Sequence, residues 1–356
     1  MATIAPITTT SPNNLPQQDM SLRKSNFELL RIVAMLLVML VHANYLSLGA
    51  VTQSEVIATP GTGFTRIFTE QICIVSVNLF VLLSGWFGIR PSFKKLASLL
   101  FQVMFIGLVT VTCCKIAGYD TPAHSLEKLL WFGSYYWFIP AYIILFMLAP
   151  VLNAFTERAE KREFRGVVIG LLIAQALFGW LSADTGHYAN GYSALSFIGL
   201  YLLAQYIRRH CERLINLEWW KWLLLYLLFT AIPSIIAFVG LYYKDDQYGA
   251  IAYSSLFVVA ASASLMMMFS RFNFESRTIN WLSTSAFAIY LVHQAPVADH
   301  IYKTFFNSAY HSMHGGLYIL FAVVAALVIG FACILLDRVR IALWNVILRL
   351  TNKTQQ

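Results

Sequence analysis

Long apolar runs separated by short polar segments dominate this chain. Ten runs are each about as long as a helix that crosses a bilayer, for which roughly 20 residues are needed. They cover residues 29–49, 72–90, 96–114, 137–154, 166–183, 192–208, 220–242, 251–269, 279–299 and 316–336. The pattern predicts an all-α, polytopic membrane protein with about ten transmembrane helices, folded as one membrane domain over residues 23–348.

The composition excludes an ordinary soluble protein. Of the 356 residues, 58% are hydrophobic and 12% are charged, whereas about 25% are charged in a typical soluble domain. The five cysteines show no metal or disulfide spacing, so we expect apolar fillers. We expect residues 1–22, which are rich in Thr, Pro, Asn and Gln, to form a disordered cytoplasmic tail. We expect residues 349–356 to form a second, short cytoplasmic tail.

The basic residues predict the orientation in the membrane. If the N-terminus is inside, 20 Lys and Arg residues fall on the inner side, and five fall outside: Arg66, Lys115, Lys128, Lys244 and Lys303. This asymmetry predicts that both termini are cytoplasmic and accounts for the net charge of +8. The longest outer loops are then expected at 50–71, 115–136 and 300–315. No basic patch or motif for nucleic acid is found.

Two histidines fall at one depth of the predicted bundle. His42 is 13 residues from the inner end of the first run, and His293 is 14 residues into the ninth. Both are about 20 Å deep, and Asn78 is about 9 Å from the outer face, so the three share a layer. Tyr290 is one helical turn before His293. Ionisable groups at membrane depth are costly and usually functional, so we predict a polar pocket here. No carboxylate or Cys has matching spacing, so no metal is expected.

The inner half of the bundle offers further candidates. Arg31 precedes His42 by eleven residues, or about 16 Å along one helix. Ser84 and Gly85 either pack helices closely or let a ligand approach the backbone. Three cations follow at the cytoplasmic mouth, Arg90, Lys94 and Lys95. They either set topology or bind a phosphorylated cytosolic ligand.

Four segments in chain order resemble the acyltransferase-3 family of integral-membrane acyltransferases. NFELLR at 26–31 with His42 resembles the first helix of that family, with its Arg-x10-His spacing. VNLFVLLSGWF at 77–87 is similar to its Phe-Phe-Val-x-Ser-Gly-Phe signature. YWFIPAY at 136–142 is similar to its Trp-Phe segment, and AIYLVH at 288–293 to its late Tyr-Leu-x-His helix. The resemblance covers residues 23–345.

The resemblance implies transfer of an acetyl group from acetyl-CoA to hydroxyls of cell-envelope glycans. The stand-alone branch, which modifies surface polysaccharides in the bacterial cytoplasmic (inner) membrane, is closest in character. His42 would be the catalytic histidine and Arg31 its companion. Many members carry Asp where this chain has Asn78, and an Arg-x-x-Arg pair where it has Arg90, Lys94 and Lys95.

The resemblance and the depth argument together give a hypothesis for the site. The phosphates of CoA would bind Arg90, Lys94 and Lys95, with Ser84 and Gly85 along the acyl-CoA path. His42 would act as a general base or carry the acyl group. His293, Tyr290, Asn78 and Trp137 would orient it or the acceptor. The donor could be acetyl or succinyl.

Two other functional classes stay open at this stage. One is a transporter or flippase for polysaccharides or lipid-linked sugars, although no paired halves or charged mid-membrane pairs are found. The other is a membrane sensor or assembly factor without catalytic activity.

Overall fold

A computed structural model describes residues 24–119, 136–182, 186–247, 249, 251–313 and 315–353. Within these residues every regular element is a helix, which confirms the all-α class. Seven helical segments in this part of the chain are long and apolar enough to cross a membrane. The predicted N-terminal tail, residues 354–356 of the C-terminal tail, and residues 120–135 of the predicted loop 115–136, including Lys128, lie outside the described residues.

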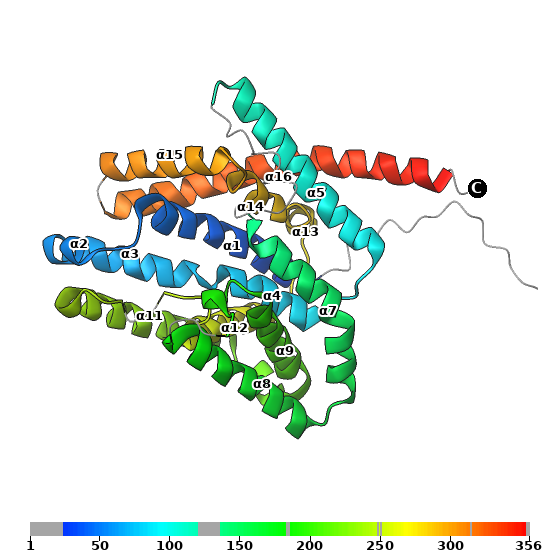
Figure 1. The fold of residues 1–356 in the computed structure, drawn as a ribbon, viewed down its shortest axis with the longest axis horizontal. Helices are drawn as coiled ribbons and strands as arrows, with labels where there is room; N and C mark the ends of the chain where they lie inside the picture. The colour runs from blue at the N-terminus through cyan, green and yellow to red at the C-terminus, as the bar shows by residue number, and fades with distance from the viewer. Residues whose placement is uncertain are drawn as a thin grey trace, which may run out of the picture.

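The first half of the chain forms the centre and one flank of the bundle (Figure 1). Its helices are α1 (Ser25–Val41), η2 (His42–Leu46), α2 (Gln53–Ala58), α3 (Pro60–Cys73), α4 (Val75–Phe87), α5 (Phe93–Ile116), α7 (Phe138–Arg158), α8 (Lys161–Ala176), η4 (Leu177–Leu181), η5 (Ala189–Gly191) and α9 (Ala194–His210). α1 packs against α3, α4, α12, α13, α14 and α16. This central position follows from its sequence, because apolar residues surround a helix with few charges.

The second half of the chain closes the bundle around α1. Its helices are α10 (Glu212–Ile215), α11 (Trp219–Lys244), α12 (Leu256–Ser270), α13 (Arg277–Ser283), α14 (Phe287–His293), α15 (Ala298–Ser312) and α16 (Gly316–Lys353). α11 lies along α12, and α16 packs against α1, α5 and α14. With 38 residues, α16 is about 57 Å long, and its last turns extend past the other helices (Figure 1).

Each predicted run coincides with helical structure, but several details differ. The run 279–299 is not one continuous helix, because α13 and α14 are separated and α14 ends at His293. The predicted loops 50–71 and 300–315 are wrong as loops, since α2, α3 and α15 occupy them. α9 and α12 have 17 and 15 residues, and α13 and α14 have seven each, so seven segments of the described chain reach the length of one continuous span.

Two contacts join segments that were predicted to lie on the same side of the membrane. Arg209 Nη1 donates to the carbonyl oxygen of Thr156 at 3.0 Å, and both belong to segments predicted on the inner side. Asn307 Nδ2 donates to the carbonyl oxygen of Ser47 at 3.1 Å, and both belong to segments predicted on the outer side. We call these two ends of the bundle the inner and outer ends. Which end faces the cytoplasm stays a prediction.

Two large hydrophobic clusters and one small one form the interior, and the two large ones meet at one place. One is built mainly on α4, α9 and α12, and the other on α1, α5, α14 and α16. Phe80 on α4 and Phe138 on α7 pack against both clusters. The candidate site lies at this seam.

Candidate active site

The backbone changes its helical type at His42. α1 ends at Val41, and the five residues of η2 that follow, starting at His42, form a π-helical turn. Such turns are rare and are frequent at functional sites. The carbonyl oxygen of His42 accepts the backbone N–H of Ser47 and also its hydroxyl, at 2.8 Å. The turn therefore fixes the backbone that carries the imidazole.

The two histidines predicted at one depth are in direct contact. His42 Nδ1 and His293 Nε2 are 2.8 Å apart, and both side chains are buried. His293 Nδ1 also bonds the carbonyl oxygen of Ile289. The structure thus brings α1 and α14 together through these two side chains.

The second bond assigns the tautomers of the neutral pair. A carbonyl oxygen only accepts, so His293 Nδ1 carries a proton and its Nε2 has a lone pair. His42 Nδ1 must then donate to that lone pair. The proton-free nitrogen of His42 is therefore Nε2, and the described chain shows no hydrogen bond to it. A nitrogen oriented in this way can accept a proton from a substrate.

Aromatic side chains surround His42 at a small cavity, which we call the neck. Its volume is about 20 Å³, and it is lined by Met35, Val38, His42, Val77, Phe80, Trp137, Phe138, Tyr253, Phe287 and Tyr290. The ring centroids of Tyr290 and His293 are 6.3 Å apart. The Tyr290 hydroxyl is buried near the backbone of Phe138 but makes no hydrogen bond of standard geometry within the described residues. Two predicted orienting residues, Tyr290 and Trp137, thus lie beside His42.

A larger cavity adjoins the neck on the outer side. Its volume is about 580 Å³, and it shares His42, Trp137 and Tyr253 with the neck. Its other lining residues include Tyr45, Glu70, Trp180, Asn190, Tyr192, Gln294, Asp299 and Lys303. Aromatic faces with carboxyl, amide and amine groups among them suit a ligand that is both flat-faced and hydroxyl-rich.

A third cavity lies on the inner side of the neck. Its volume is about 340 Å³, and its lining includes Arg31, Ser84, Gln102, Tyr142 and Ser283. It shares Phe80, Phe138 and Phe287 with the neck. The three cavities therefore follow one another from the inner end to the outer end, with His42 at the neck and in the outer cavity.

Arg31 lies in the inner cavity and not beside His42. Its Nη1 pairs with Glu28 Oε1 at 2.6 Å, and the other oxygen of Glu28 accepts from Ser283 Oγ at 2.6 Å. The guanidinium also lies 5.8 Å from the ring centroid of Phe87. Arg31 and His42, which were predicted to act together, are therefore not in contact, and Arg31 lines the inner cavity instead.

Of the three predicted residues on α4, Ser84 lines a cavity, whereas Gly85 and Asn78 contact neighbouring segments of the chain. Ser84 Oγ lies 3.3 Å from Tyr142 Oη, and Ser84 lines the inner cavity. A Cβ on Gly85 would come within 2.4 Å of the Tyr201 carbonyl oxygen, so this glycine lets α4 and α9 approach closely. Asn78 Nδ2 donates to the Tyr253 carbonyl oxygen at 3.0 Å. Asn78 thus lies behind a residue that lines the site.

Arg90, Lys94 and Lys95 lie at the inner end, outside the three cavities, and are exposed. Lys95 Nζ donates to the carbonyl oxygen of Arg90 at 2.8 Å. Asn153 Nδ2 holds the adjoining Ile89 carbonyl oxygen at 2.8 Å. Their contact with CoA stays a prediction. The hydrogen bond from Asn153 holds the backbone at the start of the segment that carries them.

Sequence reasoning missed most of the outer cavity. Glu70, Tyr253, Trp180 and Asp299 line this cavity but are not among the predicted site residues. Their only sequence signal is polar or aromatic character near helix ends, which is common in membrane proteins. In the described part of the chain, no group of three or more His, Cys, Asp or Glu residues could hold a metal ion.

Comparisons with known proteins identify a family. A family model described as an acyltransferase domain, acyltransferase-3, matches residues 24–336. No curated protein and no solved structure matches the chain. The matched range runs from the residue before α1 to the middle of α16 and includes both histidines and all three cavities.

Proposed function

This chain belongs to the acyltransferase-3 family of membrane acyltransferases, and from that premise we propose that it is an O-acetyltransferase. It moves an acetyl group from acetyl-CoA to a hydroxyl of a cell-surface polysaccharide or its lipid-linked precursor, in the bacterial cytoplasmic membrane. The observation that carries the proposal is the oriented His42–His293 pair between two cavities. A transferase must bring two substrates to one base, and each cavity gives one substrate its own approach.

The inner cavity suits the acyl donor. Acetyl-CoA joins a long amide-containing arm to a polyanion, and the cavity offers Ser84 and Gln102 as hydrogen-bonding side chains. Arg31 stands at its inner part, where a guanidinium binds phosphate well. Arg90, Lys94 and Lys95, which lie exposed at the inner end, add further positive charge there. The thioester would then reach the neck from the inner end.

The chemistry proceeds through the Nε2 atom of His42. This nitrogen takes the proton of the acceptor hydroxyl while the hydroxyl oxygen forms a bond to the thioester carbonyl carbon. The carbon–sulfur bond then breaks, and the leaving sulfur takes the proton back from His42. The imidazole ends neutral, and the acetyl ester and free CoA are the products. A transient acetyl group on the same nitrogen is the second possible route.

The neighbouring side chains orient the base. His293 accepts from His42 Nδ1 and is itself held by the Ile289 carbonyl oxygen, so the His42 ring keeps the tautomer that the reaction needs. The Tyr290 hydroxyl, which has no hydrogen bond of standard geometry in the described chain, faces the same neck. It can donate to the thioester oxygen as negative charge develops there.

The outer cavity suits the glycan. Sugar rings stack on aromatic faces and hydrogen-bond through their hydroxyls, and Trp137, Trp180 and Tyr192 line the cavity with Gln294 and Asp299. The neck, at about 20 Å³, has room for about one water molecule. This supports transfer at the neck over the passage of a whole sugar through it, as a flippase would require.

The test is transfer of label from radiolabelled acetyl-CoA to envelope glycans in membranes. We expect His42→Ala to abolish transfer, because no other described group replaces Nε2, with a loss of at least about 10²-fold. His300→Ala is the matched control, because His300 is an exposed histidine on α15. Both variants should elute as folded protein in detergent. Full transfer by His42→Ala would refute the mechanism, and no transfer by wild type would refute the function.

A further inference from the structure

Glu70 is a buried carboxyl group that the acyl-transfer chemistry above does not use. It lies on α3, is only 3% exposed, and lines the outer cavity together with His42. Ionisable groups inside a membrane bundle are costly and mark function more often than stability. The question is therefore what this carboxyl group binds.

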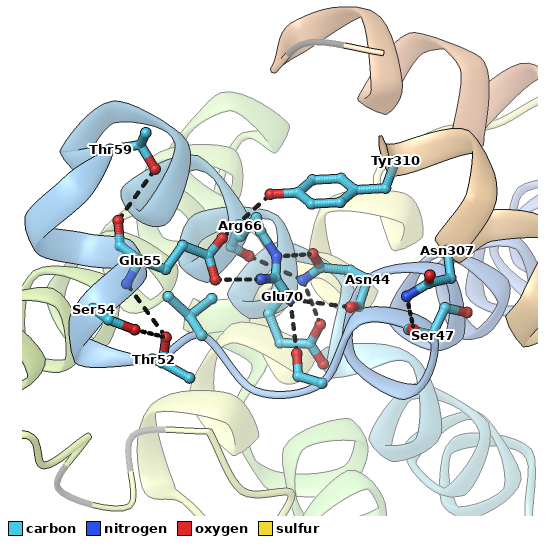
Figure 2. A network of polar contacts seen from close by, with 12 residues as sticks. Asn44, Ser47, Thr52, Ser54, Glu55, Thr59, Arg66, Glu70, Asn307 and Tyr310 are labelled. Atoms are coloured by element: carbon cyan, nitrogen blue, oxygen red, sulfur yellow. Dashed lines mark hydrogen bonds and ion pairs between the residues drawn. The ribbon is translucent and has the colours of Figure 1, made fainter. Parts of the chain in front are cut away.

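The nearest cation is already committed to another carboxylate (Figure 2). Arg66 Nη1 pairs with Glu55 at 2.6 Å, and Nη2 donates to the Gly49 carbonyl oxygen at 2.7 Å. The Tyr310 hydroxyl donates to the second oxygen of Glu55 at 3.3 Å. This arrangement satisfies Arg66 without any hydrogen bond to Glu70.

Asn44 holds one oxygen of Glu70 in place. Its Nδ2 donates to Glu70 Oε2 at 2.9 Å and to the Arg66 carbonyl oxygen at 3.0 Å, so both of its amide protons are used. Asn44 lies two residues after His42 in the same π-helical turn, η2. The carboxyl group is thereby tied to the turn that carries the base (Figure 2).

The other oxygen of Glu70 has no hydrogen bond within the described residues. A carboxylate offers about four acceptor positions, and buried acceptors are nearly always satisfied. Among the described residues, the carboxyl group of Glu70 receives one hydrogen bond, from Asn44 to Oε2. The aromatic lining beside it, including Tyr45 and Tyr192, supplies faces for a ring but no cation.

We propose that Glu70 is an acceptor-binding residue that recognises a sugar ring. Its Oε1 forms a hydrogen bond with one hydroxyl of the ring while a different hydroxyl of the same ring reaches His42 Nε2. This inference rests on the proposed O-acetyltransferase function. It adds that a carboxyl group, held by Asn44 at a set place relative to His42, selects which hydroxyl is acetylated.

The experiment uses purified full-length protein in liposomes, radiolabelled acetyl-CoA and glycan extracted from host envelopes, added at increasing concentration. For Glu70→Gln, we expect the half-saturating glycan concentration to rise about tenfold or more. The KM for acetyl-CoA and the maximal rate should change less than threefold. The position of acetylation on the ring, mapped by NMR, should become mixed.

Glu55→Gln is the matched control, because it removes a carboxylate of the same network that does not line the cavity. It should keep the wild-type glycan dependence. An unchanged glycan dependence and acetylation pattern for Glu70→Gln would overturn the inference while leaving the proposed function intact. Equal losses in both variants, with lower melting temperatures, would overturn it as well by showing a structural role. No transfer by wild type would remove the proposed function and this inference with it.

Discussion

At the scale of single residues, the key property is the proton-free nitrogen of His42. It depends on a chain of two hydrogen bonds, from His42 Nδ1 to His293 and from His293 Nδ1 to the Ile289 carbonyl oxygen. Removing His293 frees the His42 ring to rotate and to place its proton on either nitrogen. The orientation of the base thus comes from α14, far along the chain.

We therefore expect His293→Ala to lower kcat for acetyl transfer by about 10²-fold, the usual scale of a general-base contribution. The KM for acetyl-CoA should stay close to wild type, because His293 does not line the inner cavity. Steady-state kinetics on the purified variant measures both quantities. His311→Ala, at an exposed position on α15, is the control. A raised KM with unchanged kcat would contradict the orienting role.

The sequence predicted that His42 and His293 share one depth in the bundle, but it did not single out Glu70. Depth does not specify which helices are neighbours, so the contact between η2 and α14 is a finding of the structure. Glu70 is not among the predicted site residues because the second apolar run is predicted to begin at residue 72, whereas α3 begins at Pro60. The first four residues of α3 are polar or small, so the apolar pattern does not show that a helix begins there. Asn44 bonds both Glu70 and the Arg66 carbonyl oxygen, and these contacts depend on packing between η2 and α3, which no sequence pattern specifies.

At the scale of elements, the π-helical turn η2 decides where His42 points. Its wider backbone leaves the His42 carbonyl oxygen to be satisfied by Ser47, through both the backbone N–H and the hydroxyl. No sequence pattern distinguishes this turn from a continuing α-helix. The break between α13 and α14 is similar, because the residues between them are compatible with a continuous apolar run.

Ser47→Ala tests the turn. Loss of one hydroxyl donor costs about 1 kcal/mol, which corresponds to about fivefold in kcat if it is felt in the placement of His42. We expect a fall of that size in kcat and little change in either KM. Ser312→Ala removes a comparable bond, from Ser312 Oγ to the Ser308 carbonyl oxygen at the end of α15, and should leave kcat unchanged. Equal effects of the two substitutions would argue against a special role for η2.

At the scale of the whole molecule, the neck and the two larger cavities lie where the two large hydrophobic clusters meet. Phe80 and Phe138 belong to both clusters and line the neck and the inner cavity. Where the two clusters meet, aromatic side chains leave a cavity on each side of the neck. The packing of the helices therefore creates the candidate site. The fold class and the helical runs followed from hydropathy, whereas this seam follows from how the helices pack against each other.

The proposed path requires that the inner end face the cytoplasm, where acetyl-CoA is found. Cysteines introduced at Lys303 and Arg90 test this requirement, in a background where Cys113 and Cys211 are replaced by Ser and the three remaining cysteines are buried. A charged, membrane-impermeant maleimide added to spheroplasts should label Lys303→Cys, which lines the outer cavity, and leave Arg90→Cys unlabelled. Inverted vesicles should reverse the pattern, because the excess of Lys and Arg lies on the inner side. Labelling of Arg90→Cys from outside would place the donor cavity on the wrong side for a cytosolic thioester. The assignment of the two cavities to donor and acceptor would then have to be exchanged.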